Sequence, residues 1–267
     1  MNLFRFFLYI SGINFLYHFF AGDRLITLGY HSISEKEDKE TGYTHLSVEK
    51  SVFRKHLKIL KRWGYSFLSV RDIILIREGK MPFPHRAAVI YFDDGLKDVF
   101  LNAYPILKEM EVPAIVFPVV DFMEKKATYP DMEGRSGGRD IFLSWEELKK
   151  MGDIFELGTH TLTHRKLGAL NEKDVSREFS ESKRVIEEKT GGQVIASSYP
   201  KSNFTEEVQS LVQDVGFLAS FGNGRGINKK AELFFLKKIP VGPRDTVIDF
   251  KVKISIWYPL LRFLKFI

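Results

Sequence analysis

Cysteine is absent from the 267 residues of this chain. Disulfide bonds and thiolate metal sites are therefore excluded, and cysteine usage gives no information on the redox compartment. A nucleotide-binding signature is also absent, because the Gly-rich run GFLASFGNGRG at 216–226 lacks the strand–GxGxxG–helix context, and we interpret it as a loop. No basic stripe is interleaved with aromatic residues, so we expect no nucleic-acid partner.

Long apolar runs are scarce, and none reaches the ~20 residues that a membrane-spanning helix needs. The N-terminal segment 1–24 is rich in Phe and Tyr, but Asn14 and His18 interrupt it. The C-terminal segment 246–267 is aromatic and aliphatic with cationic residues interspersed. Both segments fit either helices packed on the body or anchors at a membrane interface, with a signal peptide or a single span as the third choice. A membrane-associated or cytoplasmic location is favoured, and export remains an alternative.

The charge balance is basic, with a formal net charge of +6. It fits either a solvated, Lys-rich surface or a preference for anionic partners, such as an acidic membrane face or a charged polymer. Hydrophobic residues make up 44% of the chain, which supports an ordinary folded core. The length fits one large α/β domain or two small ones. Because no linker or internal repeat divides the sequence, we expect a single domain over 25–245.

Predicted strands and helices alternate along that domain. The apolar runs predict strands at 24–31, 65–70, 87–92, 114–120, 155–160, 194–200, 217–222 and 234–241. The amphipathic runs predict helices at 47–64, 71–79, 100–110, 144–152, 171–192 and 205–216, with Ser47 as the N-cap of the first. Alternation with short connections indicates βαβ units and a parallel sheet. About seven such units favour a closed or nearly closed (β/α) barrel over an open sheet.

Polar side chains follow four of these predicted strands. Active sites in parallel α/β folds collect at the C-terminal ends of strands, so these positions are the candidates for function. The residues are Tyr30 and His31, Asp93 and Asp94, His160 and His164, and Tyr199 with Lys201.

Two of these pairs predict a metal site when they are taken together. Asp93 and Asp94 alone fit a helix N-cap or a buried salt bridge, and His160 and His164 alone fit surface histidines. If HTLTH continues as a helix, its two imidazoles lie on one side and can bind one ion. Two imidazoles and one carboxylate form a facial set that leaves positions open. The second carboxylate is then free to accept a proton, and a divalent ion relieves its repulsion with the first.

The stretches AVIYFDDGLKD and ELGTHTLTH, in that order, resemble the polysaccharide deacetylase family, the NodB-homology domain of carbohydrate esterase family 4. LGYHSI resembles the branch whose first strand carries Tyr-His. The resemblance runs from about Leu25 to Val241 and implies a distorted (β/α) barrel that removes acetyl groups from sugars. It implies Asp93 as the catalytic base.

The same resemblance implies Asp94, His160 and His164 as ligands of a divalent metal ion, for which Zn²⁺ is the first choice. It also implies Lys201, the residue after the Pro of SSYPKS, as the donor of a backbone N–H to an oxyanion. We assign Tyr199 and Lys201 to substrate binding.

Two positions depart from the family pattern. Ser198 stands where the family usually has an Arg that orients the catalytic Asp, so the support for Asp93 has to come from elsewhere. The C-terminal His that acts as general acid is missing, since no His follows His164. We take His31 as its substitute, because it ends a different strand at the same face; the alternative is a His that only forms hydrogen bonds in the barrel mouth.

These features predict a metal-dependent hydrolase that removes an N-acetyl or related acyl group from a sugar. The expected partner is an N-acetylated polysaccharide or a lipid-linked glycan, and the apolar, basic ends suggest peripheral contact with a membrane. The two departures leave open an alternative, a catalytically silent domain on the same scaffold that only binds glycan.

Overall fold

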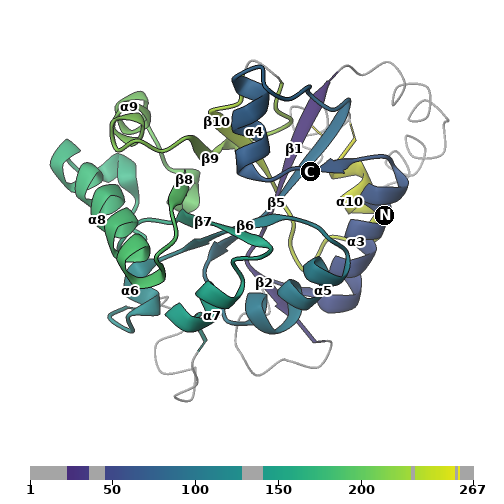
Figure 1. The fold of residues 1–267 in the computed structure, drawn as a ribbon, viewed down its shortest axis with the longest axis horizontal. Coiled ribbons are helices and arrows are strands. Elements are labelled where there is room, and N and C mark those ends of the chain that lie inside the picture. The colour runs from purple at the N-terminus through teal and green to yellow at the C-terminus, as the bar shows by residue number, and fades with distance from the viewer. Residues whose placement is uncertain (1–22, 36–45, 128–140, 230–231, 256–257, 259–267) are drawn as a thin grey trace.

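A closed ring of parallel strands forms the centre of the molecule (Figure 1). The computed structural model describes residues 23–35, 46–127, 141–229, 232–255 and 258. Within them, seven strands pair in the order β1-β10-β9-β8-β7-β6-β5, and β5 pairs with β1 to close the ring. These strands are β1 (Arg24–Tyr30), β5 (Arg86–Asp94), β6 (Ala114–Pro118), β7 (Phe155–Thr159), β8 (Val194–Ser198), β9 (Ala219–Arg225) and β10 (Phe235–Pro240). The predicted single-domain (β/α) barrel is confirmed.

The remaining elements lie outside the ring. The helices are α3 (Lys50–Arg62), α4 (Val70–Arg77), α5 (Tyr104–Glu109), α6 (Val120–Met123), α7 (Trp145–Lys150), α8 (Glu172–Thr190), α9 (Glu206–Asp214) and α10 (Val247–Lys253). Strand β4 (Ser66–Phe67) pairs with the start of β5, and β2 (Ser32–Ser34) pairs with β3 (Ser47–Glu49) in a separate small sheet. Short turns of helix occur at Val99–Ala103, Leu167–Ala169 and Pro200–Ser202.

Strand β5 shows why a continuous apolar run was the right signal for a barrel strand. Ala87 through Asp94 are all buried. Its alternate side chains enter two different hydrophobic clusters: Ala88, Ile90 and Phe92 pack with the surrounding helices, while Tyr91 belongs to the other cluster. A strand covered on both faces needs apolar residues at every position, which is the pattern of a parallel sheet.

Aromatic rings fill the barrel interior. The centroid of the Tyr91 ring lies 5.8 Å from that of Phe117 and 5.3 Å from that of Phe221, and the Phe117 and Phe221 centroids are 5.0 Å apart. Two glycines make room for these rings. A Cβ on Gly29 would lie 2.2 Å from the Tyr91 hydroxyl, and one on Gly158 would lie 2.2 Å from the Phe117 ring. The interior is therefore a packed core.

Two local predictions are wrong. The helix expected from Ser47 begins at Lys50, because Ser47 lies in β3, where its hydroxyl accepts a hydrogen bond from Ser32 at 2.7 Å. The Gly-rich run that we interpreted as a loop contains all of β9, which begins within the strand predicted at 217–222, continues to Arg225 and pairs with β10 through a register shift. Local sequence indicated flexible backbone there, but pairing with two neighbouring strands gives it strand geometry.

The terminal segments are only partly described. Residues 1–22 and 259–267 lie outside the described residues, so their prediction as packed helices or interfacial anchors stays a prediction. Helix α10, in the predicted segment 246–267, packs against α3. In the part of the chain that the structure describes, no helix combines the length and apolar character required to cross a membrane.

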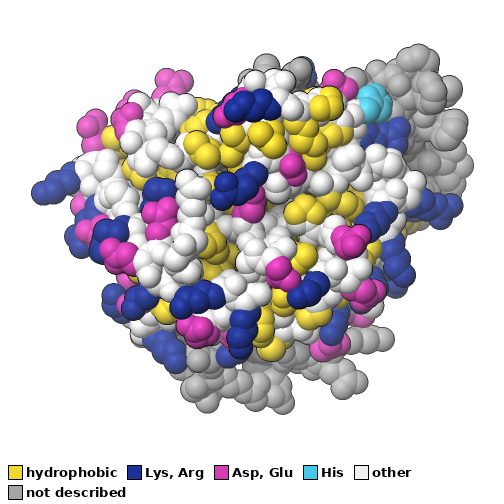
Figure 2. Space-filling model, viewed as in Figure 1, with side chains coloured by type: hydrophobic (Ala, Val, Ile, Leu, Met, Phe, Trp, Pro, Cys, Tyr) yellow, Lys and Arg dark blue, Asp and Glu magenta, His cyan; other side chains and the backbone are white. Residues whose placement is uncertain are grey.

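The excess of positive charge does not form a single field on the face that Figure 2 shows. Lys and Arg side chains are interspersed there with Asp and Glu. Ion pairs at the surface include those of Arg54 with Glu109 and of Lys108 with Asp153. The mixture of signs on the face shown fits a solvated surface.

The imidazole of His56 is buried in the core, and its burial makes the stability of the fold depend on pH. The side chain is fully buried, and its ring stacks on Phe250 with centroids 3.8 Å apart. Its Nδ1 lies 3.2 Å from the Tyr30 hydroxyl. Burial lowers the pKa of His56 to about 3, and the positive charge of Lys253 acts in the same direction. The folded protein therefore keeps His56 neutral at pH values where the unfolded chain protonates it.

This difference predicts an acid-dependent loss of stability. Below pH ~6.5 the unfolded chain binds a proton at His56 that the folded chain does not bind until about pH 3. The free energy of unfolding should thus fall with decreasing pH, by up to about 1.4 kcal/mol per pH unit from this residue. Urea unfolding at pH 7, 6, 5 and 4.5 measures it, and His56→Phe should have a shallower pH dependence than the wild type.

His85 offers a matched control, because its side chain is 50% exposed. His85→Gln should leave the pH dependence of the unfolding free energy as it is in the wild type. Equal slopes for the wild type and His56→Phe would contradict the prediction.

Candidate metal centre and active site

The predicted metal ligands lie together at the mouth of the barrel. Asp94 ends β5, His160 follows β7, and His164 lies four residues further along the chain. The carboxylate oxygen Oδ1 of Asp94 is 3.5 Å from Nε2 of His160 and 3.4 Å from Nε2 of His164. One ligand atom from each residue lies within 4.8 Å of the others.

This donor set fits a zinc-like ion. In tetrahedral zinc sites with bonds of about 2.0–2.1 Å, neighbouring ligand atoms are roughly 3.3–3.4 Å apart. The two distances from Asp94 Oδ1 to the imidazole nitrogens match that spacing. Two imidazoles and one carboxylate also leave coordination positions for water or substrate. The three residues can therefore hold a divalent metal ion.

A backbone carbonyl orients His160. Its Nδ1 lies 2.9 Å from the carbonyl oxygen of Ser198, at the end of β8. Because a carbonyl oxygen only accepts, Nδ1 carries the hydrogen and Nε2 keeps a lone pair directed toward Asp94. An outer hydrogen bond of this kind fixes the tautomer of a metal-binding His. His160 is 2% exposed, so its ring has little freedom to turn.

The second His is kept neutral by its surroundings. The pKa of His164 is lowered to about 4, chiefly by burial and also by the neighbouring His160 and Lys201, while the two aspartates act in the opposite direction. The centroids of the two imidazole rings are 5.0 Å apart. Only a neutral imidazole has the lone pair that a metal needs, so His164 is ready to bind at neutral pH without losing a proton.

The prediction that HTLTH continues as a helix is wrong. Residues 160–166 form a turn, in which Thr161 and His164 have left-handed backbone with φ of 74° and 61°. The turn brings the two imidazoles together by a route that helical spacing did not anticipate. Its polar atoms have partners: the Thr161 hydroxyl accepts a hydrogen bond from the His164 N–H at 3.1 Å.

A buried carboxylate, that of Glu178 on α8, holds this turn. Its two oxygens accept hydrogen bonds from the Leu162 and Thr163 N–H groups at 3.0 and 2.9 Å, and from the Thr163 hydroxyl at 2.5 Å. The Arg165 side chain donates another at 3.3 Å. Glu178 is 2% exposed. Sequence reasoning missed it, because a Glu in an amphipathic helix is usually solvated; its only signal was its place among the apolar positions Val175, Phe179 and Ile186.

Asp93 lies beside the three ligands but has different partners. Its Oδ1 accepts a hydrogen bond from the Ser198 hydroxyl at 2.8 Å, and its Oδ2 lies 3.9 Å from Nζ of Lys238 on β10. His160 Nδ1 is 3.9 Å from Oδ1. Only 1% of Asp93 is exposed. Ser198, the departure from the family pattern, thus supports Asp93 through its own side chain; Lys238 was not predicted from the sequence.

Gly95 makes the sharp turn after the two aspartates. Asp94 and Gly95 both have left-handed backbone, with φ of 74° and 75°. A Cβ on Gly95 would lie 2.9 Å from the Cβ of Pro118 on the neighbouring strand β6. Asp tolerates this backbone region, and Gly occupies it at no steric cost. The turn gives the two carboxylates different neighbours although they are adjacent in sequence.

The other predicted residues divide between the mouth and the core. Nε2 of His31 lies 3.8 Å from Asp94 Oδ2, the side chain is 28% exposed, and it borders the ligands at the solvent side. Lys201 is exposed, has φ of 56°, and lies close enough to His164 to affect its pKa. Tyr199 is fully buried and packs against Phe179 and Phe204. A substrate contact through the Tyr199 side chain therefore has no support.

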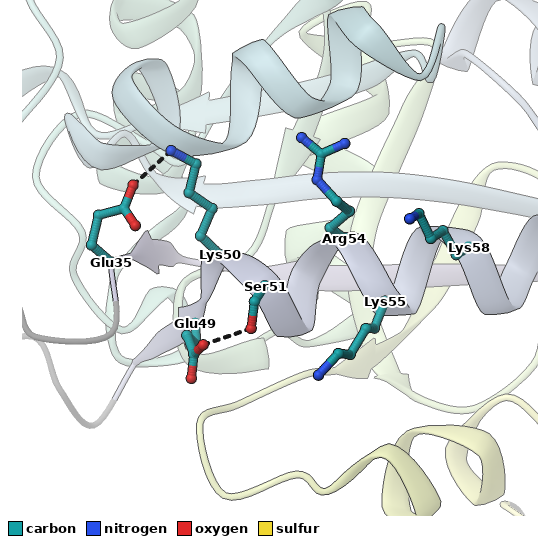
Figure 3. A pocket seen from close by; sticks show the side chains of 7 residues that line it. All are labelled: Glu35, Glu49, Lys50, Ser51, Arg54, Lys55 and Lys58. Atoms are coloured by element: carbon teal, nitrogen blue, oxygen red, sulfur yellow. Dashed lines mark hydrogen bonds and ion pairs between the residues drawn. The ribbon is translucent and has the colours of Figure 1, made fainter.

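A second hollow lies on α3 and does not involve the predicted site (Figure 3). Lys50 there reaches Glu35 at 2.6 Å, and the Ser51 hydroxyl donates to Glu49. The lining residues are Glu35, Glu49, Lys50, Ser51, Arg54, Lys55 and Lys58. None of the predicted catalytic, metal-binding or substrate-binding residues is among them.

Comparisons with known proteins agree with this geometry. A family model described as polysaccharide deacetylase matches residues 80–220. A putative polysaccharide deacetylase of Bacillus subtilis, YxkH, is 26% identical over 223 residues, which cover 82% of this chain and 72% of that protein. A poly-beta-1,6-N-acetyl-D-glucosamine N-deacetylase of Staphylococcus aureus is 24% identical over 195 residues, which cover 72% of this chain and 64% of that protein, slightly less than two thirds of its length.

A solved structure shares the fold. The Streptococcus pyogenes deacetylase PplD, in complex with acetate, superposes with a TM-score of 0.73 at 22% identity, covering 87% of this chain and 99% of that one. The family model spans more than half of this sequence and includes Asp93, Asp94, His160 and His164, but not His31. On this evidence the chain belongs to the polysaccharide deacetylase family.

Proposed function

We propose that this protein is a metal-dependent hydrolase that removes an N-acetyl or related acyl group from a sugar in a polysaccharide or a lipid-linked glycan. The observation that carries the proposal is the cluster of Asp94, His160 and His164 with an additional buried carboxylate, Asp93, directly beside it. A site that only bound glycan would not need this second carboxylate. Family membership supports the deacetylase class, and the donor set supports metal dependence.

The metal ion would be held by Asp94 Oδ1 and the Nε2 atoms of the two histidines. When bound, a divalent ion such as Zn²⁺ would lower the pKa of a water molecule at the site and polarise the carbonyl oxygen of the acyl group. The neutral state of His164 favours its binding at neutral pH.

Asp93 is the proposed general base. Ser198 and Lys238 hold its carboxylate at the mouth of the barrel, where it takes the proton of the attacking water. The backbone N–H of Lys201 is the proposed donor to the oxyanion that forms on the acyl group, since its turn lies at the end of β8, beside Ser198. The amide C–N bond then breaks, and acetate and the free amine leave.

His31 is the proposed general acid for the leaving amine. It lies on the solvent side of the site, 3.8 Å from Asp94, and a substrate entering from solvent would meet it. A partly exposed imidazole and the buried carboxylate of Asp93 provide one group for each of the two proton transfers, one from the water and one to the amine. Because the S. aureus relative is a poly-beta-1,6-N-acetyl-D-glucosamine N-deacetylase, a β-1,6-linked N-acetylglucosamine oligomer is the first compound to assay.

The first prediction concerns the metal and the base. Zn²⁺-loaded wild-type protein should release acetate from N-acetylglucosamine oligomers, and a chelator should abolish this release. Asp93→Asn should lower kcat by about 10²–10⁴-fold while the protein still binds zinc, because it removes the base and keeps the ligands. His160→Gln should lose zinc and activity together. Acetate release and bound zinc are measured on the same samples.

A silent glycan-binding domain predicts a different result. Such a domain would bind the oligomer but release no acetate, even with zinc bound. Asp93→Asn would then change neither the acetate release nor the amount of bound zinc. Acetate release that persists in the presence of chelator would contradict metal dependence.

The second prediction tests His31 as the general acid by comparing two substrates whose leaving groups differ in their need for a proton. His31→Gln should lower kcat on an N-acetyl amide by about 10²-fold, because an amine must be protonated to leave. On an aryl acetate ester the same variant should retain most of its activity, since a phenolate leaves without a proton. Equal losses on amide and ester, or no loss on the amide, would exclude His31 as the general acid.

The third prediction concerns the turn that carries His164. Glu178→Gln removes the charge that holds two backbone N–H groups and the Arg165 side chain, so it should weaken zinc binding by about 10–100-fold. Titration with a chelating dye measures the Kd for zinc. Glu181→Gln, on the same helix and paired with Arg177 at the surface, is the matched control and should bind zinc as the wild type does. An unchanged Kd for zinc in Glu178→Gln would contradict the prediction, because the turn would then keep its conformation without the charge of Glu178.

A further inference from the structure

The barrel mouth contains two buried carboxylates that are adjacent in sequence. Asp93 and Asp94 are 1% and 2% exposed. A buried charge needs a partner of opposite charge or strong hydrogen bonds, because water cannot solvate it. The imidazoles face Asp94 and prepare it for a divalent ion. Asp93 needs a partner of its own, and the Ser198 hydroxyl is a neutral donor to only one of its oxygens.

Lys238 supplies the opposite charge. Its Nζ lies 3.9 Å from the other oxygen, Asp93 Oδ2, and its side chain is only 13% exposed. A lysine that buries its ammonium group does so at a cost in solvation, so a buried carboxylate beside it is the partner that offsets this cost. As an ammonium it has no lone pair for a metal ion, so it can act only through Asp93 or through a substrate.

The alternation of side chains along β10 directs Lys238 toward the site. Lys238 follows Leu236 by two residues, so the two side chains lie on the same face of the strand. Leu236 belongs to the buried cluster that also contains Tyr91 and Phe221, and Lys238 continues this face toward Asp93. The register between β10 and β9 shifts beside it, where two residues of β10 span four of β9.

We propose that Lys238 is a positioning residue for Asp93, holding Oδ2 with its ammonium group while the Ser198 hydroxyl holds Oδ1. With both oxygens held, the carboxylate stays in one orientation toward the water whose proton it takes. The role rests on the proposed deacetylase function, but the ion pair itself does not. Lys238 reaches the site from β10, a strand for which no catalytic residue was predicted.

The kinetic test compares removal of the charge with its replacement. Lys238→Met should lower kcat for acetate release by about 10–100-fold, with KM and the zinc stoichiometry close to those of the wild type. Lys238→Arg keeps the charge and should recover most of the lost kcat. Lys237→Met is the matched control, because Lys237 pairs with Glu232 at the surface, and its kcat should equal that of the wild type. A wild-type kcat in Lys238→Met, or a Lys238→Arg as impaired as Lys238→Met, would overturn the proposal.

A stability cycle tests the ion pair independently of activity. Urea unfolding of the wild type, Asp93→Asn, Lys238→Met and the double variant gives the coupling between the two side chains. We expect a coupling of about 10-fold in the folding equilibrium constant, equivalent to about 1.4 kcal/mol. Additive effects would overturn the proposal even if the wild type released no acetate. Absence of release with a strong coupling would instead count against the proposed function alone.

Discussion

The mouth of this barrel depends on one electrostatic constraint, the burial of two adjacent carboxylates. Asp93 and Asp94 are close in sequence and nearly inaccessible to water, so each requires partners that remove its cost of burial. The left-handed backbone at Asp94 and Gly95 separates their surroundings. One carboxylate faces two imidazoles, and the other faces a hydroxyl and an ammonium group. The proposed base and the proposed metal ligand are therefore neighbouring residues of the same type in different surroundings.

The charges explain why a metal ion suits this arrangement better than protonated histidines do. Burial lowers the pKa of His164 to about 4, so this ring contributes no positive charge at neutral pH. Lys238 offsets one of the two carboxylates. A divalent cation among Asp94, His160 and His164 would offset the other and use the lone pairs that neutral imidazoles offer. The carbonyl of Ser198 contributes by leaving Nε2 of His160 free for coordination.

The sequence predicted the barrel, and it also pointed to the residues that the structure brings together as a possible metal site, because both follow from short patterns. The run Ala87–Phe92 is apolar at every position, as a strand covered on both faces requires, and the carboxyl ends of parallel strands must meet at one mouth. The turn at 160–166 was not predictable from spacing, because its shape depends on Glu178, a residue of another element. Lys238 escaped prediction for a similar reason: its contact with Asp93 depends on how β10 and β5 are placed in the ring, which no local pattern contains. Likewise, Ser47 fits an N-cap by local sequence, but pairing of β3 with β2 decided its conformation.

The packed interior also determines from which side the chemistry proceeds. Tyr91 lies two residues before Asp93 on β5, and its ring contacts those of Phe117 and Phe221 across the barrel. Gly29 and Gly158 allow these rings to fill the space beneath the aspartates. The packed interior thus leaves the mouth as the side from which water and a substrate would approach Asp93. If Asp93 is the base, as proposed, approach from one side and partners for both of its oxygens would give the carboxylate a single orientation toward an incoming water, which is the pre-organisation that general-base catalysis requires.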